Sequence, residues 1–204
     1  MRKMLILTGF MLAAVSAPVR AAESKPVYKW VSANEYYFIL PAPQDLYLPG
    51  NKDTTVVHPW GFGVRAVGNG ERFSSTGGLQ IRSVKAANRS LPASNSFYIL
   101  EMPLGVEYMT PKAEGKPLRF TASALGDLGL SDSQFFVAPV LSAGLLYTTD
   151  ESASTPTGLT FNIFYRLTDI NLDNVGGGNR GTLKPAFGFK IGYIFAGFWT
   201  PKEK

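Results

Sequence analysis

The chain has 204 residues, one histidine and no cysteine, and its formal net charge is +5. The absence of cysteine excludes a disulfide framework, a thiolate metal site and a lipid-modified cysteine behind a signal segment. A single histidine argues against a histidine-based metal centre. We therefore expect neither a metal nor another cofactor, and no enzymatic activity that depends on one.

Residues 1–21 are predicted to be a cleaved secretory signal peptide. Arg2 and Lys3 precede a mainly apolar run over residues 4–17, and Val19-Arg20-Ala21 places small or apolar residues at the −3 and −1 positions of a cleavage site. The apolar run is shorter than the roughly 20 residues that a membrane-spanning helix needs. An uncleaved N-terminal anchor is the alternative.

The mature chain, residues 22–204, is long enough for one domain with its own core. It contains no run of 18 consecutive apolar residues, so we expect no transmembrane helix. Three basic residues leave with the signal peptide, which lowers the net charge to about +2. This balance gives no reason to expect a nucleic-acid partner.

Apolar and polar positions alternate over stretches of the mature chain that glycine and proline separate, a pattern that predicts β-strands. The clearest stretch covers residues 97–110. One of its faces carries Glu101 and Glu107 among small residues. The other face is an apolar stripe of Tyr98, Leu100, Met102, Leu104, Val106 and Tyr108. In a strand these two sets point to opposite sides.

Eight such stretches predict an all-β fold, an eight-stranded antiparallel up-and-down barrel. The expected strands are 27–40, 57–68, 72–86, 96–110, 116–127, 134–149, 157–168 and 184–199. The faces of the first strand are not cleanly separated. The connections at one end are 41–56, 87–95, 128–133 and 169–183, and those at the other are 69–71, 111–115 and 150–156. Long loops opposite short turns are the layout of bacterial outer-membrane barrels.

The apolar faces are predicted to meet lipid, and the polar faces to line the lumen. Large side chains on every strand would overfill the narrow interior of an eight-stranded barrel, whereas small residues and scattered charges would fit. Tyr98 and Tyr108 are about 33 Å apart along a strand, which matches two aromatic girdles once the strand tilts. The candidates for a charged lumen network are Glu101, Glu107, Arg65, Arg82, Arg119, Arg166 and Lys190.

Three stretches carry a family resemblance: Leu100–Tyr108 with its Glu-x-Pro-Leu motif, Phe135–Tyr147, and the closing Lys190–Phe195. They resemble the small outer-membrane barrels of the OmpA/OmpX type and the PorT-like outer-membrane β-barrel domain. The resemblance implies a porin-like transmembrane barrel in the outer membrane of a Gram-negative bacterium. The implied partners are outer-membrane lipid, lipopolysaccharide and the outer-membrane assembly machinery. Gly197 departs from the alternating aromatic ending of such barrels.

No motif indicates catalysis or a metal. His58 has no flanking serine and is expected to be a loop or interfacial residue, not a catalytic base. The glycine-rich stretch Gly176–Gly181 lacks the Gly-Lys-Ser/Thr of a phosphate loop and is expected to be an outer loop. An oxygen-rich calcium site could use Asp169, Asn171, Asp173 and Asn174, but these lack EF-hand spacing and a solvated loop is expected.

Two functional hypotheses follow. The first is a non-enzymatic outer-membrane barrel with a side-chain-filled lumen and no wide pore. Its loops 41–56, 87–95 and 169–183 would serve surface interaction, envelope integrity or a secretion complex. The second is a soluble periplasmic barrel with an apolar ligand inside. The direction of the apolar face of the last strand discriminates between them: it points outward in the first hypothesis and inward in the second.

Overall fold

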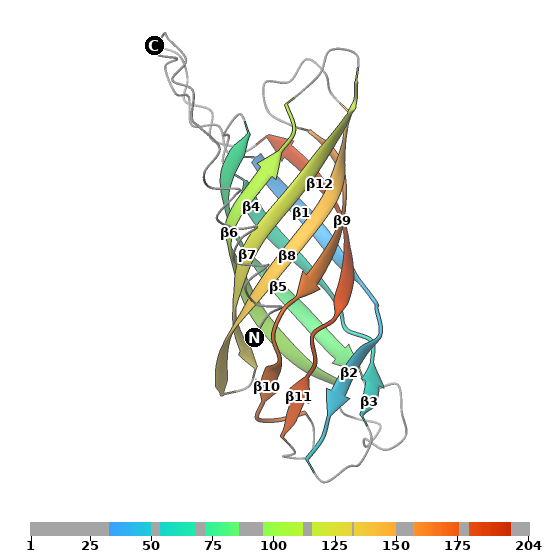
Figure 1. Ribbon diagram of the computed structural model, residues 1–204, viewed down its shortest axis with the longest axis vertical. Helices are drawn as coiled ribbons and strands as arrows, with labels where there is room; N and C mark the ends of the chain where they lie inside the picture. The colour runs from blue at the N-terminus through green and yellow to red at the C-terminus, as the bar shows by residue number, and fades with distance from the viewer. Residues whose placement is uncertain are drawn as a thin grey trace, which may run out of the picture.

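The computed structural model describes residues 33–49, 54–67, 72–85, 96–111, 116–131, 133–149, 157–175 and 180–196. Eight strands close an antiparallel barrel, the long upright body in Figure 1. They are β1 (Ala33–Leu40), β4 (Trp60–Val67), β5 (Phe73–Lys85), β6 (Ser96–Met109), β7 (Leu118–Ser131), β8 (Gln134–Thr148), β9 (Gly158–Arg166) and β12 (Phe187–Ala196). Among the described residues, no helix has the length and apolar character needed to span a bilayer.

The barrel closes because its first strand pairs on both edges. Strand β1 pairs with β4 and with the last strand β12, so that Ala33 lies opposite both Val67 and Ala196. A closed antiparallel barrel leaves no strand edge unpaired. Each remaining barrel strand pairs with its neighbours in sequence order, once the short strands of the connections are set aside.

All eight predicted barrel strands are confirmed, within a few residues at their ends. The faces of β1 are cleanly separated, contrary to expectation: Tyr36 and Phe38 point outward while Glu35 and Tyr37 are buried. Several predicted parts lie outside the described residues: the signal peptide 1–21, the start of the first strand at 27–32, the connections 87–95, 69–71 and 150–156, residues 112–115 of the connection 111–115, and the end of the last strand at 197–199.

The predicted connection 128–133 was wrong. Strand β7 continues through Ser131, which pairs with Gln134 at the start of β8. Two residues separate this pair in the sequence, so the connection is short and not one of the long loops. The alternation itself continues to the hairpin, and Gly129 leaves room inside the barrel for the Phe136 ring, since a β-carbon there would overlap it.

Two of the long connections fold into a second, smaller sheet at one end of the barrel. Its strands are β2 (Gln44–Tyr47), β3 (Thr55–Val57), β10 (Ile170–Leu172) and β11 (Gly181–Leu183), in the order β10-β11-β2-β3. They project from the lower end of the barrel in Figure 1. We call this the sheet end, and the opposite end the turn end. The predicted loops 41–56 and 169–183 therefore contain strands of a sheet in their described parts, while residues 50–53 and 176–179 lie outside the described residues.

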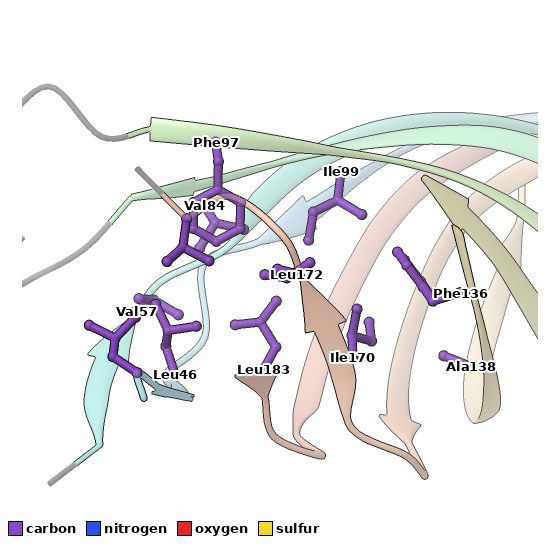
Figure 2. Packing of buried hydrophobic residues seen from close by; sticks show 12 residues of the cluster. Leu46, Val57, Val84, Phe97, Ile99, Phe136, Ala138, Ile170, Leu172 and Leu183 are labelled. Atoms are coloured by element: carbon purple, nitrogen blue, oxygen red, sulfur yellow. The ribbon is translucent and has the colours of Figure 1, made fainter. Parts of the chain in front are cut away.

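An apolar core joins the small sheet to the barrel at the sheet end. Buried side chains of β5, β6 and β8 pack there against those of the small sheet (Figure 2). Burial of this much apolar surface is the main force that holds the loops in place. The core comprises Leu46, Leu48, Val57, Val84, Phe97, Ile99, Phe136, Ala138, Ile170, Leu172, Val175 and Leu183.

The barrel wall is apolar outside, whereas its inner face carries the buried charged and polar side chains beside small apolar clusters. On β6 the stripe from Tyr98 to Val106 is exposed, whereas Glu101 and Glu107 are buried. On β12, Phe187 and Ile191 are likewise exposed. The predicted facing is confirmed. A wide, continuous apolar exterior of this kind is rare on a soluble monomer.

Candidate functional site in the barrel lumen

The larger polar cluster of the lumen is centred on Glu101, whose side chain is 0% exposed. Arg82 donates to both of its carboxylate oxygens at 2.7 Å. Arg166 donates to Oε1 at 2.8 Å and also reaches Asp127 at 3.2 Å. Gln80 donates to Glu101 Oε2 at 2.8 Å. Glu101 thus accepts from three side chains, which is how a buried carboxylate is stabilised.

Tyr37 and Lys190 extend this cluster through the same glutamine. The Tyr37 hydroxyl donates to Gln80 Oε1 at 2.9 Å, and the Lys190 ammonium donates to that oxygen at 3.3 Å. The ammonium also lies 4.8 Å from the Tyr37 ring centroid and 5.0 Å from that of Phe164, within cation–π range. We call the set Tyr37, Gln80, Arg82, Glu101, Asp127, Arg166 and Lys190 the Glu101 network.

A second cluster, the Glu35 network, lies nearer the turn end. Arg65 pairs with Glu35 and, at 2.6 Å, with Glu107. The Thr160 hydroxyl also donates to Glu35. Gly192 provides the space, since a β-carbon there would crowd the Thr160 hydroxyl and Glu35. Each acidic group in the cluster therefore has a cationic partner.

The two networks carry opposite formal charges. In the Glu101 network, three cationic groups (Arg82, Arg166 and Lys190) face two carboxylates. In the Glu35 network, one guanidinium faces two carboxylates. The first is therefore formally +1 and the second −1. Together the two networks are formally neutral, but their charge is polarised along the lumen.

The sequence predicted most of these residues. The lumen positions proposed for Glu101, Glu107, Arg65, Arg82, Arg166 and Lys190 are confirmed. The prediction for Arg119 was wrong. It is half-buried near the turn end and donates to the Thr110 carbonyl, outside both networks. Strand β7 begins at Leu118, so Arg119 sits at the rim, where a backbone carbonyl is within reach.

The predicted lumen residues did not include Tyr37, Gln80, Asp127 or Glu35. Asp127 is the last residue of the predicted strand 116–127, although the alternation continues through Leu128 and Leu130 and would have placed it inside. Tyr37 and Glu35 lie on the first strand, where adjacent Tyr36 and Tyr37 make it difficult to tell from sequence which face is apolar. Gln80 lies within the predicted strand 72–86, but the sequence does not show that its amide bridges other side chains.

Some buried polar atoms of the lumen have no hydrogen-bond partner among the described residues. They include Nε of Arg166, Oδ1 of Asp127 and Oε1 of Glu107. Buried polar groups are normally satisfied by protein or water. These atoms mark where the networks can accept a further partner.

The other positions considered from sequence do not form a site. Asp169 pairs with Lys184 at 2.8 Å, and Asn171 accepts from Thr182 at 2.9 Å, so their oxygens do not converge. Among the described residues, no group of three or more acidic or histidine side chains could hold a metal. Of the glycine-rich stretch, residues 176–179 lie outside the described part.

His58 is exposed between β3 and β4. We expect His58→Ala to change the free energy of unfolding by less than about 0.5 kcal/mol, as for other surface substitutions away from special features. Urea unfolding in lipid vesicles, compared with the unaltered protein, measures this. A loss of more than about 2 kcal/mol would mean that the imidazole makes a contact essential to the fold.

Comparison with solved structures gives the class of fold: a small outer-membrane β-barrel. OprG, an outer membrane protein from Pseudomonas aeruginosa, aligns with a TM-score of 0.51 at 13% identity, covering 82% of this chain and 95% of OprG. Ail of Yersinia pestis aligns at 0.42 with 13% identity, covering 82% and 100%. Neisserial surface protein A aligns at 0.38 with 12% identity, covering 79% and 95%. No family model and no curated protein matches this sequence.

Proposed function

We propose that this chain is an integral outer-membrane protein, exported by a cleaved signal peptide over residues 1–21. One observation carries the proposal: the barrel exposes its aromatic and aliphatic side chains and buries its charges. In water this arrangement would be strongly unfavourable, whereas in a bilayer each group meets its preferred surroundings. Outer-membrane lipid and lipopolysaccharide are then its direct surroundings, and the outer-membrane assembly machinery inserts it.

The alternative of a soluble barrel with an apolar ligand inside does not fit this facing. Its central lumen would have to be apolar, but there Glu101, Arg82 and Arg166 are buried and paired with one another. A soluble barrel would also turn the face of β12 that carries Ile191 inward. In the structure the opposite face of this strand, which carries Lys190, lines the lumen.

We infer a non-enzymatic role as a closed, rigid support. The two networks fill the middle of the lumen, and the apolar core closes the sheet end, so a wide pore has no room. Long connections of outer-membrane barrels face the outside, which puts the small sheet on the cell surface. Its exposed side chains, such as Tyr47 and Asn171, would meet an external or envelope partner in surface interaction, envelope integrity or secretion-complex support.

Gel mobility tests the membrane placement. We expect the protein from purified outer membranes to run differently on an SDS gel when unheated and when boiled, because the closed barrel resists detergent until it is heated. It should also stay in the membrane pellet after alkaline extraction. A known periplasmic protein from the same cells serves as the control. Release of this protein into the soluble periplasmic fraction would overturn the proposal.

A further inference from the structure

An opening in the barrel wall lies between the barrel and the small sheet. The last residue pair of β1 and β12 is Leu40 with Phe189. Pairing resumes only in the small sheet, where Lys184 donates its backbone N–H to the Asp45 carbonyl at 2.9 Å. Pro41, Pro43 and Pro185 lie in the gap, and proline has no N–H to donate to a ladder. The two segments therefore share no backbone ladder across this gap, and Gln44 links them only at its edge by donating to the Lys184 carbonyl at 2.7 Å.

The opening leads from the lipid-facing surface to the Glu101 network. Its enclosed volume is about 20 Å³, which is room for a small polar group and not for a whole ligand. Leu40 and Phe187 stand at its exposed mouth, and Phe164 lines it inside. At its base are the guanidinium groups of Arg82 and Arg166. An apolar mouth thus meets a cationic base.

Two features of this base point to an anionic oxygen as the group it takes. The Arg166 Nε is buried and has no partner among the described residues, and Arg166 lines the opening. The Glu101 network, with Lys190 included, carries one formal positive charge in excess. A single carboxylate would balance that charge and accept from the free N–H.

We propose that the opening binds the carboxylate of a single-chain fatty acid whose tail stays in the surrounding lipid. The enclosed volume suits a carboxylate headgroup alone, and exposed Leu40 and Phe187 continue the apolar path outward to the surface where the tail would lie. The proposal rests on the membrane placement proposed above. The heat-dependent gel shift tests that placement separately, so a failure of the fatty-acid site can be told apart from a failure of the membrane placement.

Calorimetric titration of the full protein in neutral phosphatidylcholine nanodiscs tests the site. Dodecanoate should bind saturably, above its partition into empty nanodiscs, and dodecanol should bind at least about tenfold more weakly because it lacks the charge. Equal binding of acid and alcohol, or no saturable component for dodecanoate, would overturn the proposal. This comparison needs no variant, so it decides the matter even if a substitution prevents folding.

A pair of variants locates the site. Ala42 lines the opening and is not part of either network, so Ala42→Trp should fill it and weaken dodecanoate binding about tenfold or more. Ala122 on β7 is exposed and does not line the opening, so Ala122→Trp adds the same ring elsewhere and should bind like the unaltered protein. If both variants weaken dodecanoate binding equally, or if neither weakens it, the fatty acid binds elsewhere and the assignment is refuted.

Discussion

Ile191→Arg should prevent stable insertion of the barrel. Ile191 lies at the middle of β12, is 43% exposed, and sits between Phe38 of β1 and Phe161 of β9, both on the apolar exterior. If this surface contacts lipid, an arginine near the bilayer midplane costs about 2–4 kcal/mol. Urea unfolding in lipid vesicles measures the loss, and the heat-dependent gel shift in outer membranes reports the folded fraction.

Val56→Arg is the matched control. Val56 on β3 is also β-branched and 41% exposed, but it belongs to the small sheet beyond the barrel wall. A charge there stays in water, so the free energy of unfolding should change by no more than about 0.5 kcal/mol. If the free energy of unfolding falls by the same small amount in both variants, then β12 faces water and the membrane placement is wrong.

The barrel wall could be predicted from sequence because its signal is local. In β6 and β12 each residue's side is fixed by the two-residue period, whatever strand lies next to it. The narrow lumen explains the small inner residues such as Gly63 and Gly188, which leave room for the buried rings of Tyr37 and Phe164. The pairing of charges could not be predicted, because Arg166 and Glu101 are 65 positions apart and meet only through the register of several strands.

The small sheet could not be predicted for a different reason. Its strands are three or four residues long, too short to show a period, and prolines such as Pro43 and Pro59 flank them. Apolar Leu46 and Leu183 were read as loop residues because nothing in the local sequence shows the core they join. Their pairing joins connections that are far apart in the chain, which only the closed barrel brings together.

Glu101→Gln should be the most destabilising conservative change inside the lumen. The amide keeps the shape of the side chain but removes the charge that Arg82 and Arg166 share, and Asp127 alone then faces three cationic groups. Removal of one partner from a buried ion pair costs about 3–5 kcal/mol, because the remaining charge is left uncompensated. The protein should still insert, since its lipid-facing surface is unchanged.

Asp169→Asn provides the comparison, because Asp169 and Lys184 form an ion pair at the same short distance of 2.8 Å but on the exposed surface next to the small sheet. Such pairs contribute about 0–1 kcal/mol. Urea unfolding of both variants in vesicles should therefore differ by several kcal/mol. The double variant Arg82→Gln, Glu101→Gln should lose less unfolding free energy than the two single variants lose together, since each single change alone leaves a partner unpaired. Additive losses, or equal losses for Glu101→Gln and Asp169→Asn, would mean that water already screens the lumen charges and that the networks do not hold the barrel together.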